Sequence, residues 1–152
     1  MVETATRQIR IDKDGVWYYG DEEIFRKEIV LFFYQNLTRD QAGRYLIELN
    51  DERCYIEVDD TPYIVKSVYR KRLETDNRDM ICLSLSDGTV EQLDPGTLCV
   101  GKDNVLYCII KKGSFKARFS RAAYYQIADY IEHDKKNDAY SISLNGQSFY
   151  IK

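Results

Sequence analysis

Two basic stretches without an acidic residue are the part of this sequence best suited to chemistry. The first, between Asp60 and Glu74, contains Lys66, Arg70, Lys71 and Arg72; the second, between Asp103 and Asp129, contains Lys111, Lys112, Lys116, Arg118 and Arg121. Alternation within residues 115–119 predicts that Lys116 and Arg118 share one face of a strand, opposite an apolar face. Converging strands of this kind could bind a phosphate or a carboxylate. The alternative is a solvated sheet face with edge-protecting lysines.

Arg26 and Arg121 form a second pair of candidates, because each is expected to open a helix. The positive end of the helix dipole disfavours a cation at that position. Each arginine therefore needs an acidic or carbonyl partner nearby, or it helps to bind an anion at the junction of the two halves of the chain.

Three consecutive aromatic residues, Trp17, Tyr18 and Tyr19, could line a pocket or pack in the core. Successive strand residues point to opposite faces, so at least one of them should be exposed. The candidate ligand-binding residues are therefore Trp17, Tyr18, Arg26, Lys66, Arg70, Lys116, Arg118 and Arg121.

No catalytic constellation emerges from the remaining residues, so we expect no enzyme and no cofactor. His133 is the only histidine, and it lies in a polar segment where the end of a helix is expected. Asp59 and Asp60 precede Thr61-Pro62 and are typical of a turn. No Walker or dinucleotide-binding glycine motif and no calcium-loop motif occurs.

The four cysteines, Cys54, Cys82, Cys99 and Cys108, form no CxxC pair and lie among apolar residues. This pattern predicts buried free thiols in a reducing cytoplasm, and no metal site. No signal peptide is visible, and no apolar run is long enough to span a bilayer. The net charge of −3 argues against non-specific binding to nucleic acid.

The architecture that would position these residues is suggested by an internal repeat. Residues 26–57 align without a gap with residues 121–152, at an offset of 95. Seven of the 32 aligned pairs are identical, against roughly two expected from ordinary composition. Each segment contains a helix-like apolar run, a polar break and two alternating runs around a turn. This pattern predicts one supersecondary unit used twice.

The sequence therefore predicts an antiparallel-rich α+β fold with two duplicated halves, each of sheets and hairpins packed on one helix. Residues 1–74 form the predicted N-terminal repeat and residues 75–152 the C-terminal repeat, divided at the polar segment 74–79. Helices are expected at about residues 25–37 and 121–133, the first apolar nearly all round and buried on more than one side. Hairpins are expected at Asp14-Gly15, residues 50–53, Asp87-Gly88, Lys112-Gly113 and Asn145-Gly146, and a long strand at residues 63–73.

Several spaced segments resemble the DUF1285 family of uncharacterised bacterial proteins. They are DGVWYYG, IFRKEIVLFF, GRYLIEL, YIEVDDTPYIV and, in the second half, VLYCIIKKGSFKARFSRAAYYQIADY. The resemblance covers roughly residues 7–152. It implies two duplicated halves, the second superficially like a pleckstrin-homology barrel. It also implies a ligand-binding or signalling role, with a site between the halves, since the family has no established biochemical activity.

Our functional prediction is a non-enzymatic binding or regulatory module for a small anion or an acidic partner segment at the junction of the repeats. A protein–protein adaptor that uses exposed tyrosines is the first alternative. A single-stranded nucleic-acid binder with basic strands and interleaved tyrosines is a weaker one.

Overall fold

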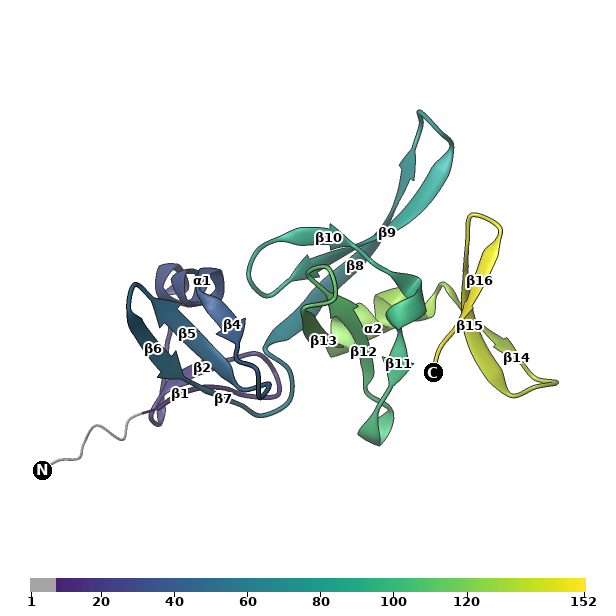
Figure 1. Cartoon of the computed structure of the whole chain (residues 1–152). Helices are drawn as coiled ribbons and strands as arrows, with labels where there is room; N and C mark the ends of the chain where they lie inside the picture. Colours follow the sequence, from purple (N-terminus) through teal and green to yellow (C-terminus); the bar gives the residue numbers. More distant parts are fainter. Residues whose placement is uncertain (1–7) are drawn as a thin grey trace, which may run out of the picture. The chain divides into compact units, whose positions relative to one another are not determined.

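The fold was analysed in a computed structural model that describes residues 8–152, and the chain divides into two compact units after Pro62. We call Met1–Pro62 the N-terminal unit and Tyr63–Lys152 the C-terminal unit. Residues 1–7 of the predicted N-terminal repeat lie outside the described residues. Both units mix helix with mostly antiparallel sheet, which confirms the predicted α+β class (Figure 1).

The N-terminal unit contains two small sheets and one α-helix. The first sheet has the order β3-β2-β1-β7, with β1 Ile9–Ile11, β2 Trp17–Tyr19, β3 Glu22–Glu23 and β7 Glu57–Val58. The second has the order β4-β5-β6, with β4 Leu37–Arg39, β5 Tyr45–Leu49 and β6 Glu52–Tyr55. Helix α1, Lys27–Gln35, lies between β3 and β4 in the chain.

Aromatic and branched side chains form the core of this unit. Trp17 is buried between Phe33 and Tyr34 of α1, at ring-centroid distances of 5.7 and 5.0 Å. The Tyr34 hydroxyl donates a 2.9 Å hydrogen bond to the carbonyl of Pro62. Ile11 of β1 is the direct cross-strand partner of Trp17 in β2, so both side chains lie on the buried face that packs on α1.

The C-terminal unit is built on a six-stranded sheet of order β10-β9-β8-β13-β12-β11. Its strands are β8 Tyr63–Leu73, β9 Arg78–Leu85, β10 Val90–Gln92, β11 Cys99–Val100, β12 Leu106–Ile110 and β13 Phe115–Phe119. A second sheet, β14-β15-β16, contains Ile131–Asp134, Ala139–Leu144 and Gln147–Tyr150. Helix α2, Arg121–Ala128, joins the two sheets, and the 3-10 turns η2 and η3 are Pro95–Thr97 and Lys102–Asn104.

Helix α2 packs against strand β8, and a side chain fixes the contact. Ala123 and Ile127 are fully buried, while Gln126 Oε1 accepts a 2.7 Å hydrogen bond from the amide of Val68. Strand β8 carries a bulge between Val65 and Ser67, where its register against β9 shifts. The bulge interrupts the regular alternation of side chains along β8.

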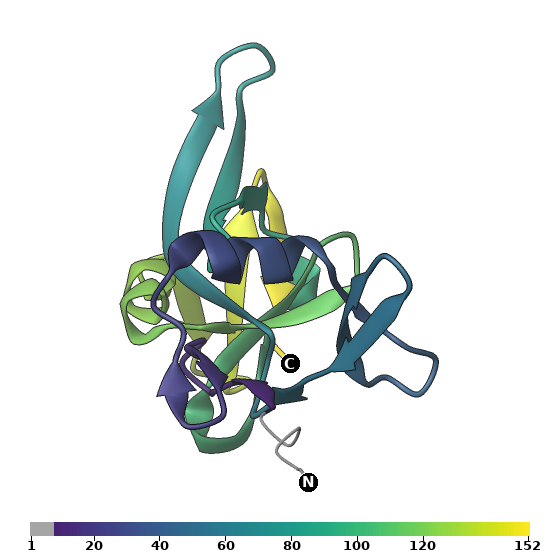
Figure 2. The ribbon, with the colours of Figure 1, turned by 90° about the vertical axis from the view of Figure 1, so that its left-hand side faces the viewer.

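The predicted boundary between the halves is corrected, because residues 74–77 form the turn of the β8–β9 hairpin and not a linker. This hairpin extends beyond the rest of the sheet (Figures 1 and 2). Its turn is polar because it is surrounded by water, and the chain divides at Pro62, before β8 begins.

Both helices end earlier than predicted, since the segment after each helix pairs as a strand. Leu37–Arg39 pairs with β5, and Ile131–Asp134 pairs with β15. Helix α1 is also less buried than predicted: Tyr34 is its only buried residue, and Leu31 and Phe32 are exposed. Phe25, just before the helix, is 81% exposed.

The two three-stranded sheets share their strand order and the register of their second hairpin. In β5–β6, Leu49 pairs with Glu52 and Ile47 with Cys54; in β15–β16, Leu144 pairs with Gln147 and Ile142 with Phe149. Each pair in the first hairpin thus corresponds to a pair 95 positions later in the second hairpin. The turn residues Asn50 and Asn145 also have similar positive φ angles, of 52° and 53°.

Candidate functional site

The two aromatic candidates of the N-terminal unit serve packing. Trp17 is buried, and its indole N–H is the one buried side-chain polar atom of the described residues without a hydrogen-bond partner. The ring of Tyr18 is covered by the guanidinium of Arg10, 4.7 Å from its centroid, and Arg10 forms a 2.8 Å ion pair with Asp59. Desolvation, followed by the nearby charge of Asp12, raises the pKa of Tyr18.

Arg26 and Arg121 do not occupy equivalent positions, which corrects their predicted pairing. Arg26 is the N-cap residue of α1, whereas Arg121 follows the N-cap Ser120 of α2. Arg26 lies 2.6 Å from the carboxylate of Glu28, and that hydrogen bond lowers the pKa of Glu28. The acidic partner expected for a cation at a helix start is thus present for Arg26.

Arg70 also has an intramolecular partner. It forms a 2.9 Å ion pair with Asp79 across the hairpin, and Arg72 binds the other carboxylate oxygen of Asp79 at 3.3 Å. The guanidinium of Arg70 lies 5.5 Å from the ring centroid of Tyr130. The hydrogen bond from Arg70, ahead of the charge of Arg72, lowers the pKa of Asp79.

Strand β13 has the predicted division into a basic and an apolar face. Ala117 and Phe119 are buried, while Lys116 is exposed and Arg118 is half-buried. The ammonium group of Lys116 lies 4.4 Å from the ring centroid of Tyr107. Tyr107 belongs to the neighbouring strand β12, where it is the direct cross-strand partner of Arg118. Part of the positive charge of β13 therefore contacts an aromatic ring.

Lys66 and Arg121 are brought together at the start of helix α2, in a region that we call the basic corner: Lys66, Ser120 and Arg121. Strand β13 pairs in parallel with β8, and the amide of Ser120 donates to the carbonyl of Val65 at 3.0 Å. The Ser120 hydroxyl donates to the carbonyl of Lys66 at 3.3 Å and accepts from the amide of Ala123 at 3.1 Å. Ser120 thus links the β8 bulge to the first turn of the helix, of which it is the N-cap.

Neither cation of the basic corner has a side-chain partner within the described part of the chain. Lys66 and Arg121 are both exposed, and neither forms a side-chain hydrogen bond or ion pair there. The helix N-terminus adds positive potential at the same place. Among the candidate cations, these two are therefore the ones for which the described residues provide no ion pair, no side-chain hydrogen bond and no ring contact.

The sequence did not single out a lysine that fastens two loops of the C-terminal unit. The ammonium group of Lys111 lies 2.7 Å from Asp87 and 3.0 Å from the hydroxyl of Thr89, and its backbone amide donates to both carboxylate oxygens of Glu91. Although burial opposes ionisation of Asp87, the hydrogen bonds from Lys111 and Thr89 lower its pKa. Lys111 therefore connects the β9–β10 turn and strand β10 to the end of β12. Its backbone has a positive φ of 54°, which the sequence pattern does not reveal.

The other reactive side chains occupy structural positions. His133 lies in strand β14 and not at a helix end; its ring stacks on Tyr140 at 4.4 Å and contacts Asp138 at 3.0 Å. Burial raises the pKa of the Cys108 thiol to about 12, and Cys82 is also buried. Cys54 is exposed, against prediction: it lies in the short edge strand β6, where Glu52 and Arg53 are exposed as well.

Residues 8–152 contain neither a metal-binding cluster nor a membrane-spanning helix. No group of three or more histidine, cysteine, aspartate or glutamate side chains there could hold a metal ion. No helix in the same range is long and apolar enough to cross a membrane.

Fold and surface together define a two-unit α+β protein with a basic corner on its C-terminal unit. The model for the N-terminal domain of DUF1285, a domain of unknown function, matches residues 3–61, nearly the whole N-terminal unit. This match confirms the resemblance predicted from the sequence. A comparison with curated proteins gave no significant match.

Two crystal structures of DUF1285 family proteins have the same fold. The protein from Silicibacter pomeroyi DSS-3 is 21% identical, with a TM-score of 0.76 over 94% of this chain and 78% of that chain. The protein from Shewanella baltica OS155 is 19% identical, with a TM-score of 0.64 over 82% of this chain and 92% of that chain. The likeness extends to the C-terminal unit, which the matched family model does not cover.

Proposed function

We propose that this chain is a non-enzymatic binding or regulatory module that holds a small anion, or a carboxylate of an acidic partner segment, at the basic corner of its C-terminal unit. One observation carries the proposal: Lys66 and Arg121 adjoin the start of helix α2 without an internal counter-ion among the described residues. A helix start is a ready anion-binding position. The sequence-based prediction put the anion at the junction of the repeats, whereas this proposal uses contacts within one unit.

The contrast with the other candidate cations supports the same choice. Arg26 is neutralised by Glu28, and Arg70 by Asp79. An anion approaching either arginine would have to compete with a carboxylate that is already bound. At the basic corner it would replace only water, so the electrostatic gain is larger there.

Titration with inorganic phosphate tests this function. We expect phosphate to shift the amide NMR signals of Arg121 and Ala122, and a Lys66→Ala/Arg121→Ala double variant to lose that response. The matched control is Lys135→Ala/Lys136→Ala, which removes two exposed charges from the β14–β15 turn. Equal responses in both double variants would overturn the proposal, since the signal would then reflect general screening.

We also propose that the two units are duplicates of one ancestral unit. The order sheet, helix, three-stranded sheet supports this in both, as do the shared registers of β5–β6 and β15–β16. A further support is the bond from Ile56 to the carbonyl of Tyr45, which recurs from Ile151 to Tyr140. Strands β8, β9 and β10 would then be an addition to the second copy. The comparison with a pleckstrin-homology barrel and a role in signal transduction remain predictions.

A protein–protein adaptor is the second candidate, favoured by the exposure of tyrosines in the C-terminal unit. Tyr125 and Tyr150 are 66% and 59% exposed, and Tyr124 and Tyr140 are also exposed. Tyrosine is enriched in the contact regions of protein interfaces. A Tyr125→Ser/Tyr150→Ser variant that loses a pull-down partner, while still binding phosphate, would favour this function over the first.

A further inference from the structure

We infer that the outer face of the β8–β9–β10 sheet is a docking surface for an acidic protein segment with an apolar anchor. This outer hairpin face consists of Tyr69, Lys71, Arg78, Met80, Val90 and Gln92, which the strand registers put on one side of the three strands. It is separate from the basic corner, and the inference does not depend on the anion site proposed there.

The charges of the three strands are sorted between their two faces. Their only acidic residues, Asp79 and Glu91, alternate onto the opposite side, where Asp79 binds Arg70 and Arg72 and Glu91 binds the amide of Lys111. The cations of the outer hairpin face, Lys71 and Arg78, have no side-chain hydrogen bond or ion pair within residues 8–152. One face is therefore internally neutralised, while the other keeps its positive charge.

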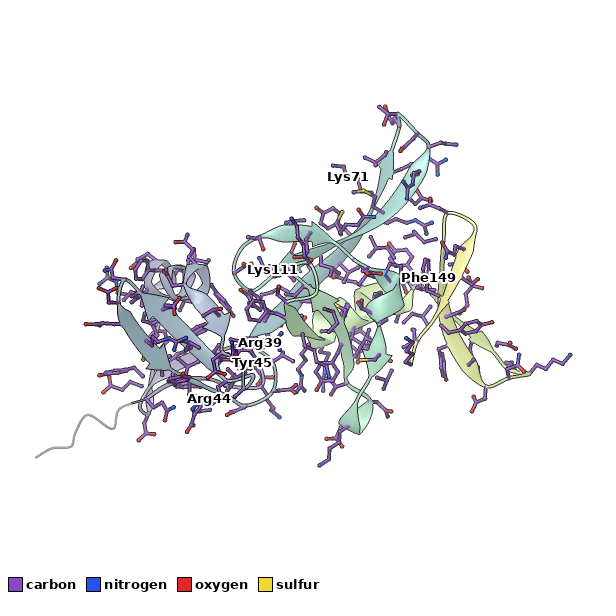
Figure 3. All side chains as sticks on the ribbon, in the orientation of Figure 1. Arg39, Arg44, Tyr45, Lys71, Lys111 and Phe149 are labelled. Atoms are coloured by element: carbon purple, nitrogen blue, oxygen red, sulfur yellow. The ribbon has the colours of Figure 1, made fainter. Side chains whose placement is uncertain are left out.

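The register also brings the two outer cations close together. Lys71 pairs with Met80, so that Arg78 is its diagonal neighbour two residues along β9. Diagonal neighbours in an antiparallel pair have Cα atoms about 7–8 Å apart, within reach of two adjacent carboxylates. Lys71 projects from the hairpin on the side away from the β14–β15–β16 sheet (Figure 3).

Apolar surface lies beside these cations. Tyr69 is 44% exposed and Val90 53% exposed, and Met80 is half-buried between the tyrosine and the charged end of the hairpin. A sheet face with an aromatic ring and a thioether next to two cations suits an extended segment in which acidic residues adjoin a leucine or phenylalanine. Charge complementarity thus selects the partner.

An acidic protein segment fits this face better than a nucleic acid does. Affinity for nucleic acid grows with the number of phosphates that a protein neutralises. Two cations on a chain of net charge −3 neutralise few phosphates.

The test uses the full chain, labelled with ¹⁵N, and the peptide acetyl-Glu-Glu-Ser-Leu-Phe-Ser-amide as the probe. We expect amide shifts confined to β8, β9 and β10. Lys71→Glu/Arg78→Glu should weaken binding roughly fivefold to tenfold, because each exposed ion pair contributes little. The matched control Lys135→Glu/Lys136→Glu changes the net charge equally and should bind as the parent chain does.

A second peptide, with Leu and Phe replaced by Ser, isolates the apolar anchor and should bind measurably less. Three results would overturn the inference. The first is equal weakening of peptide binding in both charge-reversed variants, and the second is equal binding of the two peptides. The third is that oligo-deoxythymidine shifts the same amide signals more than the acidic peptide does. The last result would assign the face to single-stranded nucleic acid. Retention of the dispersed spectrum in each variant verifies that the hairpin is still folded.

Discussion

The helices of the two units each precede a three-stranded sheet, and the second hairpins of these sheets have the same register, yet the helices have different surroundings. Helix α2 is covered by strand β8 and buries Ala123 and Ile127. Helix α1 packs on Trp17 with one side and leaves Leu31 and Phe32 exposed on the other. The difference shows that a helix followed by a three-stranded sheet can lie in the core or at the surface, according to whether a strand covers it.

The largest effect is expected where the two sheets are most alike. Ile47 and Ile142 occupy the same register position and are both buried. We expect Ile47→Ala and Ile142→Ala each to reduce the free energy of unfolding by about 2–5 kcal/mol, through lost transfer energy and a cavity. Urea denaturation followed by circular dichroism measures both.

The neighbouring residues Glu48 and Ser143, also 95 positions apart, supply the control. Glu48→Ala and Ser143→Ala change exposed side chains and should alter stability by no more than about 0.5 kcal/mol. If Ile142→Ala were costly and Ile47→Ala nearly neutral, the two sheets would not share one packing role.

The next prediction compares the sixth residue after each N-cap, Gln126 on α2 and Phe32 on α1. Gln126→Ala leaves the amide of Val68 without its acceptor and should cost about 1–3 kcal/mol. Phe32→Ala removes an exposed ring and should change stability by no more than about 0.5 kcal/mol. A large cost at Phe32, measured by the same urea titration, would mean that the exposed side of α1 has a partner in solution.

A smaller effect is expected at the helix starts. Ser120→Ala removes the acceptor for the Ala123 amide and should cost about 1 kcal/mol. Arg26 makes no side-chain cap, so Arg26→Ser should add a few tenths of a kcal/mol, up to about 1. Thermal melting of both variants tests this, with Arg26→Ala as the control that loses the Glu28 ion pair without gaining a cap. Stabilisation by Arg26→Ala as large as that by Arg26→Ser would contradict the capping argument.

The smallest effect concerns acid sensitivity in the loops after β4 and β14. Asp40 accepts the amides of Ala42 and Arg44, and Asp134 accepts the amide of Lys136 and the side chain of Asn137. The Arg44 amide is the main cause that lowers the pKa of Asp40, and the Asn137 side chain is the main cause for Asp134. Their stabilisation is present above the unfolded pKa of about 3.9 and is lost as the pH falls through the lowered folded pKa.

Asp40→Asn and Asp134→Asn should therefore each flatten the loss of stability between about pH 5 and pH 2. Urea midpoints across that range measure the slope. Asp51→Asn, in the β5–β6 turn, is the control and should keep the parent slope. An unchanged slope in both loop variants would show that neither carboxylate contributes to acid unfolding.

The sequence predicted the fold where alternation and turn residues agree. Strand β8 was predicted with its observed bounds, and turns such as Asp14-Gly15 and Asn145-Gly146 join the expected strands. The predicted ends of both helices were wrong, because the next residues form strands β4 and β14. These strands are too short to show a period-two pattern, and their conformation depends on pairing with β5 and β15. The polar segment 74–77 was read as a boundary, since a solvated hairpin turn and a linker have the same composition.

The candidate site was predicted less completely than the fold. Residue types identified Lys66 and Arg121, but only the parallel pairing of β13 with β8 brings them to one helix start. The partners of Arg26 and Arg70 depend on tertiary geometry, and Arg70 reaches Asp79 only across the hairpin. Lys71 and Arg78 share a face because residues 74–77 form a hairpin turn, whereas the sequence predicted a boundary there, which separated their two strands.

The distribution of the four thiols has a practical consequence. Cys54, the exposed one, belongs to the N-terminal unit, whereas Cys82, Cys99 and Cys108 all belong to the C-terminal unit. A thiol reagent applied to the native protein will attach first to Cys54 of strand β6 and next to the partly exposed Cys99, so a brief exposure labels the N-terminal unit without mutation. The buried thiols Cys82 and Cys108 react only when the C-terminal unit opens transiently. The rate of their modification therefore measures how often that unit opens.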